Sequence, residues 1–129
     1  MTRRRVSVLA VLLGALLLGA CASPGTTLTP VNGVGDFTQE GADWLLHVPT
    51  GIAKLRLVLP PQGRVRLRLY YAPGRPFERL EGVQVVDNAT GSSFGEGHPA
   101  VSHDGRQRVS VTSGAEPLDL MLQLVDYYR

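Results

Sequence analysis

Apolar and polar side chains alternate strictly along several stretches between residues 43 and 128. In RVRLRLYYA, residues 64–72, Val65, Leu67 and Leu69 share one face of an extended strand, and three arginines share the other. A period of two is typical of a strand with one buried face, whereas a helix repeats its apolar residues every three or four positions. The chain therefore predicts a sheet protein whose apolar faces are buried against one another.

The same alternation predicts five further strands, near residues 43–49, 55–59, 81–87, 107–113 and 118–128. Gly and Pro residues separate these stretches, and six or seven short strands with such breaks are typical of β-sandwiches and small barrels. We predict an all-β domain, a small antiparallel β-sandwich of the jelly-roll kind. Its strand order resembles that of small β-sandwich modules appended to secreted bacterial peptidases. Those modules carry an acidic, calcium-associated stretch that would fall at Arg66 to Tyr70, where this chain has arginines instead.

The segment PPQG, residues 60–63, separates two of the predicted strands. A three-residue loop of residues 61–63 would pair Leu59 with Val65 and keep the leucines of both strands on one side of a ladder, whereas a four-residue loop would not. Pro at the first loop position and Gly at the left-handed position fit a type I turn with a bulge. The sequence therefore predicts that residues 55–59 and 65–69 form a hairpin.

The first twenty residues have the pattern of an export signal. Arg3, Arg4 and Arg5 form a positive start, residues 6–18 are apolar, and Gly19 and Ala20 are small residues that a signal peptidase accepts. The apolar stretch is shorter than the roughly 18 to 20 residues that a membrane-spanning helix needs. We therefore expect residues 1–20 to be a cleaved signal peptide and not a permanent membrane span.

The segment Leu18-Gly19-Ala20-Cys21 resembles the lipobox of bacterial lipoproteins. The resemblance implies that Cys21 becomes the first mature residue, with a diacylglyceryl group on its sulfur and usually a third acyl chain on its amine. Each buried CH₂ contributes about 0.8 kcal/mol, so two or three chains anchor a protein stably to a membrane. Ala22 stands where an Asp would retain a lipoprotein in the inner membrane, which favours the outer membrane, facing the periplasm. The alternative is an ordinary cleaved signal followed by a chance cysteine.

The charge of the mature chain is close to neutral. Without Arg3, Arg4 and Arg5, the 13 basic residues fall to ten against 11 acidic ones. We therefore expect no nucleic-acid partner for an exported protein of this charge. Cys21 is the only cysteine, and its acylation would leave neither a disulfide nor a cysteine metal site. No cofactor is expected.

The Pro-, Gly- and Thr-rich stretch of residues 21–36 has no apolar periodicity, which predicts a flexible tether after the acylated cysteine. Such a coil would reach about 20 Å and lift the domain from the lipid headgroups. The sandwich domain would then occupy residues 37–129. In the alternative interpretation, Val31 or Val34 joins the sheet as part of an edge strand.

The predicted hairpin gathers four arginines on its polar face: Arg56, Arg64, Arg66 and Arg68. In that register Arg56 lies opposite Arg68, and like charges directly opposite are destabilising unless an anion is nearby. A simple solvated face would screen the arginines, and two sources of anions are also open. Acidic residues of a neighbouring strand could interleave with the arginines: Glu78, Glu81, Asp87, Glu116 or Asp119. Alternatively, the face meets an anionic partner, such as lipopolysaccharide phosphates, an acidic cell-wall polymer or an acidic patch on an envelope protein.

The long connection at residues 88–106 contains two arrangements with catalytic or metal-binding chemistry. GSSFG, residues 91–95, fits a nucleophile-elbow pattern with Ser93 as nucleophile, followed by His98, His103 and Asp104, but the helix that an elbow requires is excluded by nearby Gly and Pro. The same stretch contains four residues of types that bind metal ions: Glu96, His98, His103 and Asp104. Their spacing matches no closed metal site. We expect a non-enzymatic envelope binding or assembly module. A small hydrolase or metal-binding protein that uses this loop is the alternative.

Overall fold

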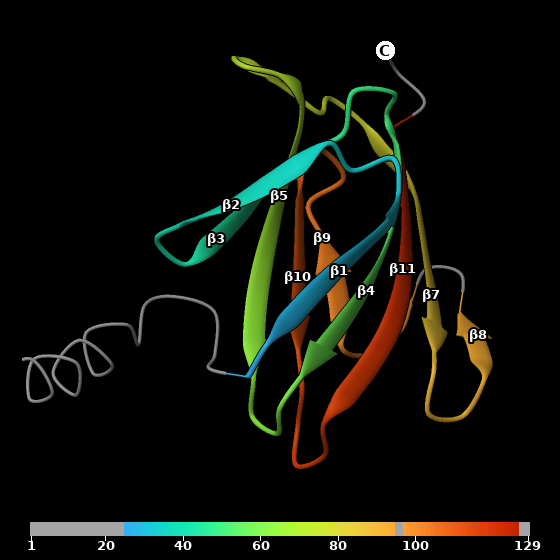
Figure 1. Cartoon of the computed structure of the whole chain (residues 1–129). Helices are drawn as coiled ribbons and strands as arrows, with labels where there is room; N and C mark the ends of the chain where they lie inside the picture. Colours follow the sequence, from blue (N-terminus) through green and yellow to red (C-terminus); the bar gives the residue numbers. More distant parts are fainter. Residues whose placement is uncertain (1–24, 95–96, 127–129) are drawn as a thin grey trace, which may run out of the picture.

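The computed structural model describes residues 25–94 and 97–126, which form two packed sheets (Figure 1). The first, sheet A, has the order β1-β4-β11-β7-β8, with bounds Thr27–Asn32, Ile52–Leu59, Leu118–Asp126, Leu80–Asp87 and Ser92–Phe94. The second, sheet B, has the order β2-β3-β5-β10-β9, with bounds Asp36–Glu40, Asp43–His47, Arg64–Ala72, Arg108–Thr112 and Val101–His103. The short strand β6, Arg75–Pro76, also pairs with β5.

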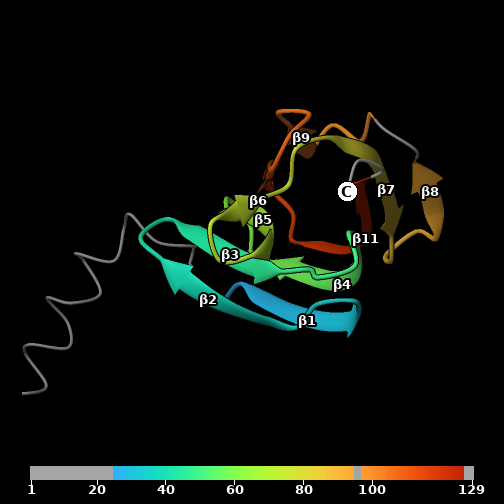
Figure 2. The ribbon, with the colours of Figure 1, turned by 90° about the horizontal axis from the view of Figure 1, so that it is seen from above.

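The two sheets bury the apolar faces that the alternation predicted. Leu57 of β4, Leu67 of β5 and Leu122 of β11 each have no exposed surface, and their apolar neighbours along each strand belong to the same core. Seen from above, β7 and β8 of sheet A lie on the opposite side of the molecule from β2, β3 and β6 of sheet B (Figure 2). The predicted all-β sandwich is confirmed. One pair departs from an antiparallel arrangement, because β3 runs parallel to β5.

The predicted hairpin across residues 60–63 is wrong. β4 pairs with β1 and β11 in sheet A, whereas β5 pairs with β3, β6 and β10 in sheet B. The turn therefore carries the chain from one sheet to the other, and the leucines of β4 and β5 lie on the facing sides of the two layers. The left-handed position is Gln62, with φ 57°, and not Gly63. The N–H of Gly63 donates to Pro60 O over 3.1 Å and closes the turn.

The prediction of a flexible tether over residues 21–36 is wrong from Thr27 onward, because β1 occupies Thr27–Asn32 and β2 starts at Asp36. β1 is the edge strand of sheet A and pairs with β4, and only Leu28 is buried. Pro30 is tolerated because an edge strand has one unpaired side. The alternative of an edge strand that includes Val31 describes this segment correctly, and the folded domain starts ten residues earlier than predicted.

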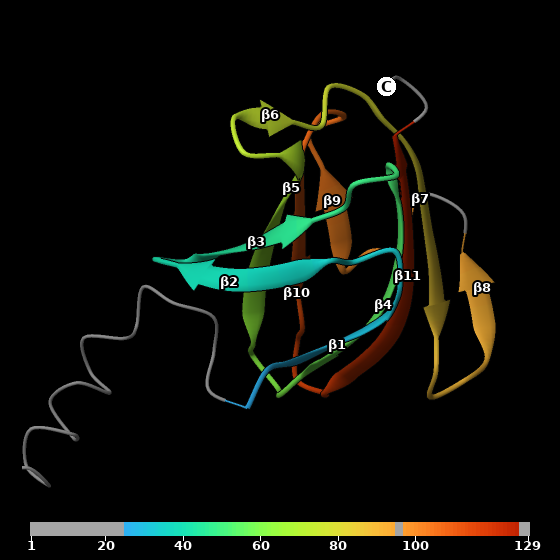
Figure 3. The same ribbon diagram turned by 45° about the horizontal axis from the view of Figure 1, so that its top comes forward.

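Gly33 lets the chain cross from β1 in sheet A to β2 in sheet B. Its φ is +80°, and a Cβ at this position would lie 2.0 Å from the carbonyl oxygen of Ile52. No side chain fits so close to backbone, and the left-handed conformation also favours glycine. Beyond this crossing, β2 and β3 project from the side of the sandwich (Figure 3).

The two ends of the sandwich carry different loops. We call the end that carries the 60–63 turn the proximal end and the opposite end the distal end. At the proximal end this turn meets residues 113–114, where the N–H of Gln62 donates to Gly114 O over 2.7 Å. At the distal end the loops of residues 73–79 and 104–107 meet, where the N–H of Leu80 donates to Gly105 O over 3.0 Å. The described chain begins at the proximal end, because a Cβ at Gly25 would lie 3.8 Å from the ring of Pro60.

Candidate functional site

The four arginines of the predicted basic face do not share a face. Arg56 lies on the outer surface of sheet A, between Thr29 and Met121 in the strand registers. Arg64, Arg66 and Arg68 follow β5 in sheet B, with their buried neighbours on the opposite side of the strand. The sandwich core therefore separates Arg56 from the other three, because the 60–63 turn joins two sheets and not two strands of one sheet.

Arg56 is neutralised on sheet A by Asp119, one of the acidic residues considered from sequence. Its Nε and Nη2 donate to the two carboxylate oxygens over 2.9 and 2.6 Å, and Asn88 donates to Oδ1 over 2.9 Å. The hydrogen bonds from Arg56 and Asn88 lower the pKa of Asp119 from 3.8 to about 2 and outweigh the opposing effect of burial. Arg56 therefore forms its ion pair on the outer surface of sheet A and is not part of an anion site on sheet B.

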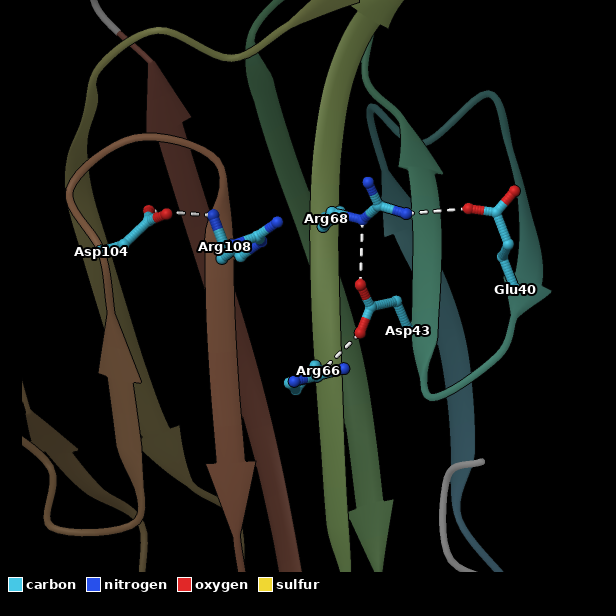
Figure 4. Close-up of polar contacts among 6 residues, drawn as sticks. All are labelled: Glu40, Asp43, Arg66, Arg68, Asp104 and Arg108. Carbon is cyan, nitrogen blue, oxygen red and sulfur yellow. Dashed lines mark hydrogen bonds and ion pairs between the residues drawn. The ribbon is translucent and has the colours of Figure 1, made fainter. Parts of the chain in front are cut away.

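Asp43 and Glu40, which sequence reasoning missed, neutralise part of the arginine row on β5 (Figure 4). Arg66 Nε donates to Asp43 Oδ1 over 2.7 Å, and the other carboxylate oxygen lies 3.0 Å from Arg68 Nε. Arg68 also donates through Nη2 to Glu40 Oε1 over 2.8 Å. Asp43 reaches both arginines because β3 pairs with β5 in parallel and sets Asp43 beside Arg66. The sequence did not reveal these two partners, because the predicted hairpin placed the wrong strand beside β5.

Arg108 extends the row toward the other side of β5. In the β5–β10 register it lies directly opposite Arg68, an arrangement of like charges that requires nearby anions. Asp104 supplies one: its Oδ1 accepts backbone hydrogen bonds from Arg106, Gln107 and Arg108 over 2.8 to 3.0 Å. Burial raises the pKa of Asp104, but these three N–H groups and the charge of Arg108 outweigh it and leave the pKa lowered.

The structure does not bring the candidate catalytic residues together. Ser93 pairs with Val86 in the β7–β8 register, which places it on the outer surface of sheet A, where it is exposed. His98 is only 7% exposed and lies 3.9 Å from Asp87, whose strand neighbour on the same face is the buried Val85. Within residues 25–94 and 97–126, no hydrogen bond from Ser93 to a histidine is present, so the base activation that an elbow needs is missing.

The candidate metal ligands are also dispersed. The Nδ1 atoms of His98 and His103 accept local backbone hydrogen bonds from Ala100 and Gly105, over 3.0 and 3.1 Å. Asp104 accepts backbone hydrogen bonds within its own turn, and Glu96 lies outside the described residues. The described part of the chain contains no group of three or more His, Cys, Asp or Glu residues able to hold a metal ion. Instead, the 88–106 connection supplies β8 to the edge of sheet A and β9 to the edge of sheet B.

Sequence reasoning also missed a basic groove at the distal end. It consists of two cavities of about 490 and 600 Å³, which share Pro76 and Gln107 in their linings. Arg68 and Arg75 line the first cavity, and Arg79, Arg106 and Arg108 line the second. Most of these arginines come from the two loops of the distal end, where no periodicity exists to reveal their proximity.

The predicted lipidation site, Cys21, lies outside the described residues. Among the residues that are described, none belongs to a helix that could span a membrane. No family model, curated protein or solved structure matches this chain.

Proposed function

We propose that this chain is a lipid-anchored, non-enzymatic binding module of the bacterial cell envelope, attached at Cys21. The observation that carries the proposal is the lipobox-like segment Leu18-Gly19-Ala20-Cys21, which follows a charged start and an apolar stretch and precedes a folded sheet domain. Ala22 after the cysteine supports the outer membrane, with the domain facing the periplasm.

The start of the domain supports a close attachment to the membrane. Only Ala22, Ser23 and Pro24 separate Cys21 from Gly25, and four residue steps span at most about 14 Å. The proximal end, where Gly25 approaches Pro60, would therefore face the lipid surface. The distal end would face away from it, because the nine residues of β5 extend about 30 Å at roughly 3.3 Å per residue.

The arginines of sheet B support a partner that is anionic. Arg64, Arg66 and Arg68 stand at alternate positions of β5, and Arg108 lies beside Arg68. Arginine binds carboxylates and phosphates through paired hydrogen bonds, which suits lipopolysaccharide, an acidic cell-wall polymer or an acidic patch on an envelope protein. Asp43 and Glu40 already hold two of these arginines, so an external anion would meet only part of the row's charge.

Fractionation of cells that express the full chain in a bacterial host tests the anchor. We expect the unchanged chain in the membrane fraction, and we expect the Cys21→Ser chain to be lost from it. Ser23→Ala is the matched control, because it changes one small residue beside the anchor and leaves the thiol intact. Membrane retention of Cys21→Ser equal to that of the unchanged chain would contradict the proposal.

A further inference from the structure

The distal groove consists of two neighbouring cavities at the end of the sandwich away from the proposed anchor. The two cavities, of about 490 and 600 Å³, have Pro76 and Gln107 in common in their linings. One wall is the 73–79 segment, which is fixed to β5 where the N–H of Phe77 donates to Leu69 O over 3.0 Å. The opposite wall is the 104–107 turn, which is fixed to the same strand by the bond from Leu69 N–H to Gln107 O, over 2.9 Å. Both walls are therefore held in place by backbone hydrogen bonds.

A buried carboxylate also positions the 73–79 wall. Asp126, at the end of β11, is 1% exposed, and its Oδ2 accepts the N–H groups of Glu78 and Arg79 over 3.0 and 3.4 Å. These two backbone hydrogen bonds hold the C-terminal part of the 73–79 segment to the end of β11. The groove is thus built into the fold and does not depend on exposed side chains alone.

Arginines outnumber acidic residues along the groove, five to three: Arg68, Arg75, Arg79, Arg106 and Arg108 against Glu40, Glu78 and Asp104. Glu40 is paired with Arg68, and Asp104 with the backbone of its own turn. Arg75 and Arg106 make no ion pair within the described parts of the chain. These two guanidinium groups, one in each cavity, are available to an external anion.

The floor of the first cavity is apolar and aromatic. Leu45, Tyr70 and Pro73 line it, and the ring of Tyr70 stacks on His47 with 5.2 Å between ring centroids. Small-molecule sites typically combine such an apolar floor with a few polar groups that fix orientation. Glu40 and Gln107 provide acceptors and donors for hydroxyl groups at the edge of the same cavity.

The backbone of the groove favours a saccharide over a peptide strand. β5, which forms the floor, is paired on one side with β3 and on the other with β10 and β6. An extended peptide that binds by adding a strand needs an unpaired edge, and β5 does not offer one. A sugar chain instead forms its hydrogen bonds with side chains, which the groove supplies.

We propose that the distal groove binds an acidic oligosaccharide, with its carboxylates on Arg75 and Arg106 and the apolar face of a sugar ring on the floor formed by Leu45 and Tyr70. This inference deepens the proposed envelope-binding function, on which it rests for the setting of the ligand. A carboxylate-bearing polymer that lies beyond the membrane surface would meet the distal end of the domain first.

Titration calorimetry with three probes tests the groove: tetragalacturonate, its methyl ester and a tetraglutamate peptide. We expect the full chain, purified in detergent, to bind tetragalacturonate in a salt-sensitive manner and to bind the other two at least ten-fold more weakly. Arg75→Ala combined with Arg106→Ala should weaken binding by about ten-fold or more, because two charge-assisted contacts are lost. Lys54→Ala is the matched control, since it removes an exposed cation from the opposite sheet.

Several results would overturn the proposal. Equal binding of the methyl ester would show that charge is not recognised, and equal binding of tetraglutamate would point to an acidic protein segment instead of a saccharide. Absence of binding by all three probes, or unchanged binding by the double arginine variant, would also reject it. The Cys21→Ser chain separates this proposal from the anchor. If Cys21→Ser binds tetragalacturonate but stays in the membrane fraction, only the anchor is rejected; if it is lost from the membrane fraction but neither it nor the unchanged chain binds tetragalacturonate, only the groove is rejected.

Discussion

Asp43→Asn removes the carboxylate that holds the arginine row of sheet B together. Asp43 is the common partner of Arg66 and Arg68, and its side chain is only 14% exposed. Arg68 is the more buried of the two arginines, because its side chain is 27% exposed. Its buried Nε lies 3.0 Å from Asp43 without the alignment of a hydrogen bond. The amide of Asn would keep the shape of the side chain but would leave both guanidinium charges without this counter-ion.

The expected cost follows from the exposure of each contact. The contact with Arg68 is a sheltered ion pair, and removal of one partner from such a pair costs more than the loss of an exposed pair, here about 1.5 to 2 kcal/mol. The contact with Arg66 is half exposed, at 52%, and pairs of that kind contribute about 0.2 to 1 kcal/mol. Together these give a loss of about 1.5 to 2.5 kcal/mol, after allowance for the remaining exposure of Arg68. For a domain of about 100 residues this corresponds to a Tm lower by roughly 6 to 15 °C.

Thermal unfolding at neutral pH, followed by circular dichroism, measures the effect. Asp36→Asn is the matched control: Asp36 is 68% exposed and lies 3.3 Å from His47, so its loss should cost less than about 0.5 kcal/mol. A Tm for Asp43→Asn equal to that of the unchanged protein would refute the reasoning, because the arginines would then need no internal counter-ion.

Three further perturbations test other parts of the structure. Gly33→Ala should lower the free energy of unfolding by more than about 2 kcal/mol, because its Cβ would meet a backbone oxygen at a position of positive φ; unchanged denaturant stability would argue against the crossing between sheets. Asp126→Ala should cost about 1 to 3 kcal/mol and speed amide exchange at residues 78 and 79, which lose their acceptor; protected amides would contradict that role. Asp119, whose folded pKa of about 2 lies below the ordinary 3.8, contributes stability above about pH 4 that is lost as the pH falls toward 2. A carboxyl titration followed by NMR should show that low pKa, and a midpoint near 3.8 would exclude the pairing with Arg56.

Sequence alternation predicted which face of each main strand is buried, but it could not identify the neighbouring strand. Leu57 and Leu67 are buried whether their strands pair in one hairpin or face each other from two sheets, because both arrangements place the leucines on the same side. The two prolines at 60 and 61 are the sequence feature that argues against a hairpin, since neither can donate a backbone hydrogen bond to a partner strand. In the structure the turn is held instead by Gly114 and by Ser113, whose N–H donates to Gly63 O over 2.9 Å.

The segments that the sequence missed are those with little burial. β1 has one buried residue, Leu28, and β2 has none, so neither shows the alternation that marks a strand with a core face. The arginine contacts were missed for a different reason. Asp43 is an unremarkable strand residue until the parallel pairing of β3 with β5 sets it between two arginines. This long-range pairing is not recorded in any local sequence pattern.

The anchor at Cys21 is tested most directly by mass spectrometry of the protein, purified from the membrane fraction of a bacterial host that expresses the full chain. We predict an N-terminus at Cys21 and a mass increased by a diacylglyceryl group, with or without a third acyl chain. A free thiol at Cys21, or a mature N-terminus at any other residue, would contradict the proposal that this domain is a membrane-anchored lipoprotein.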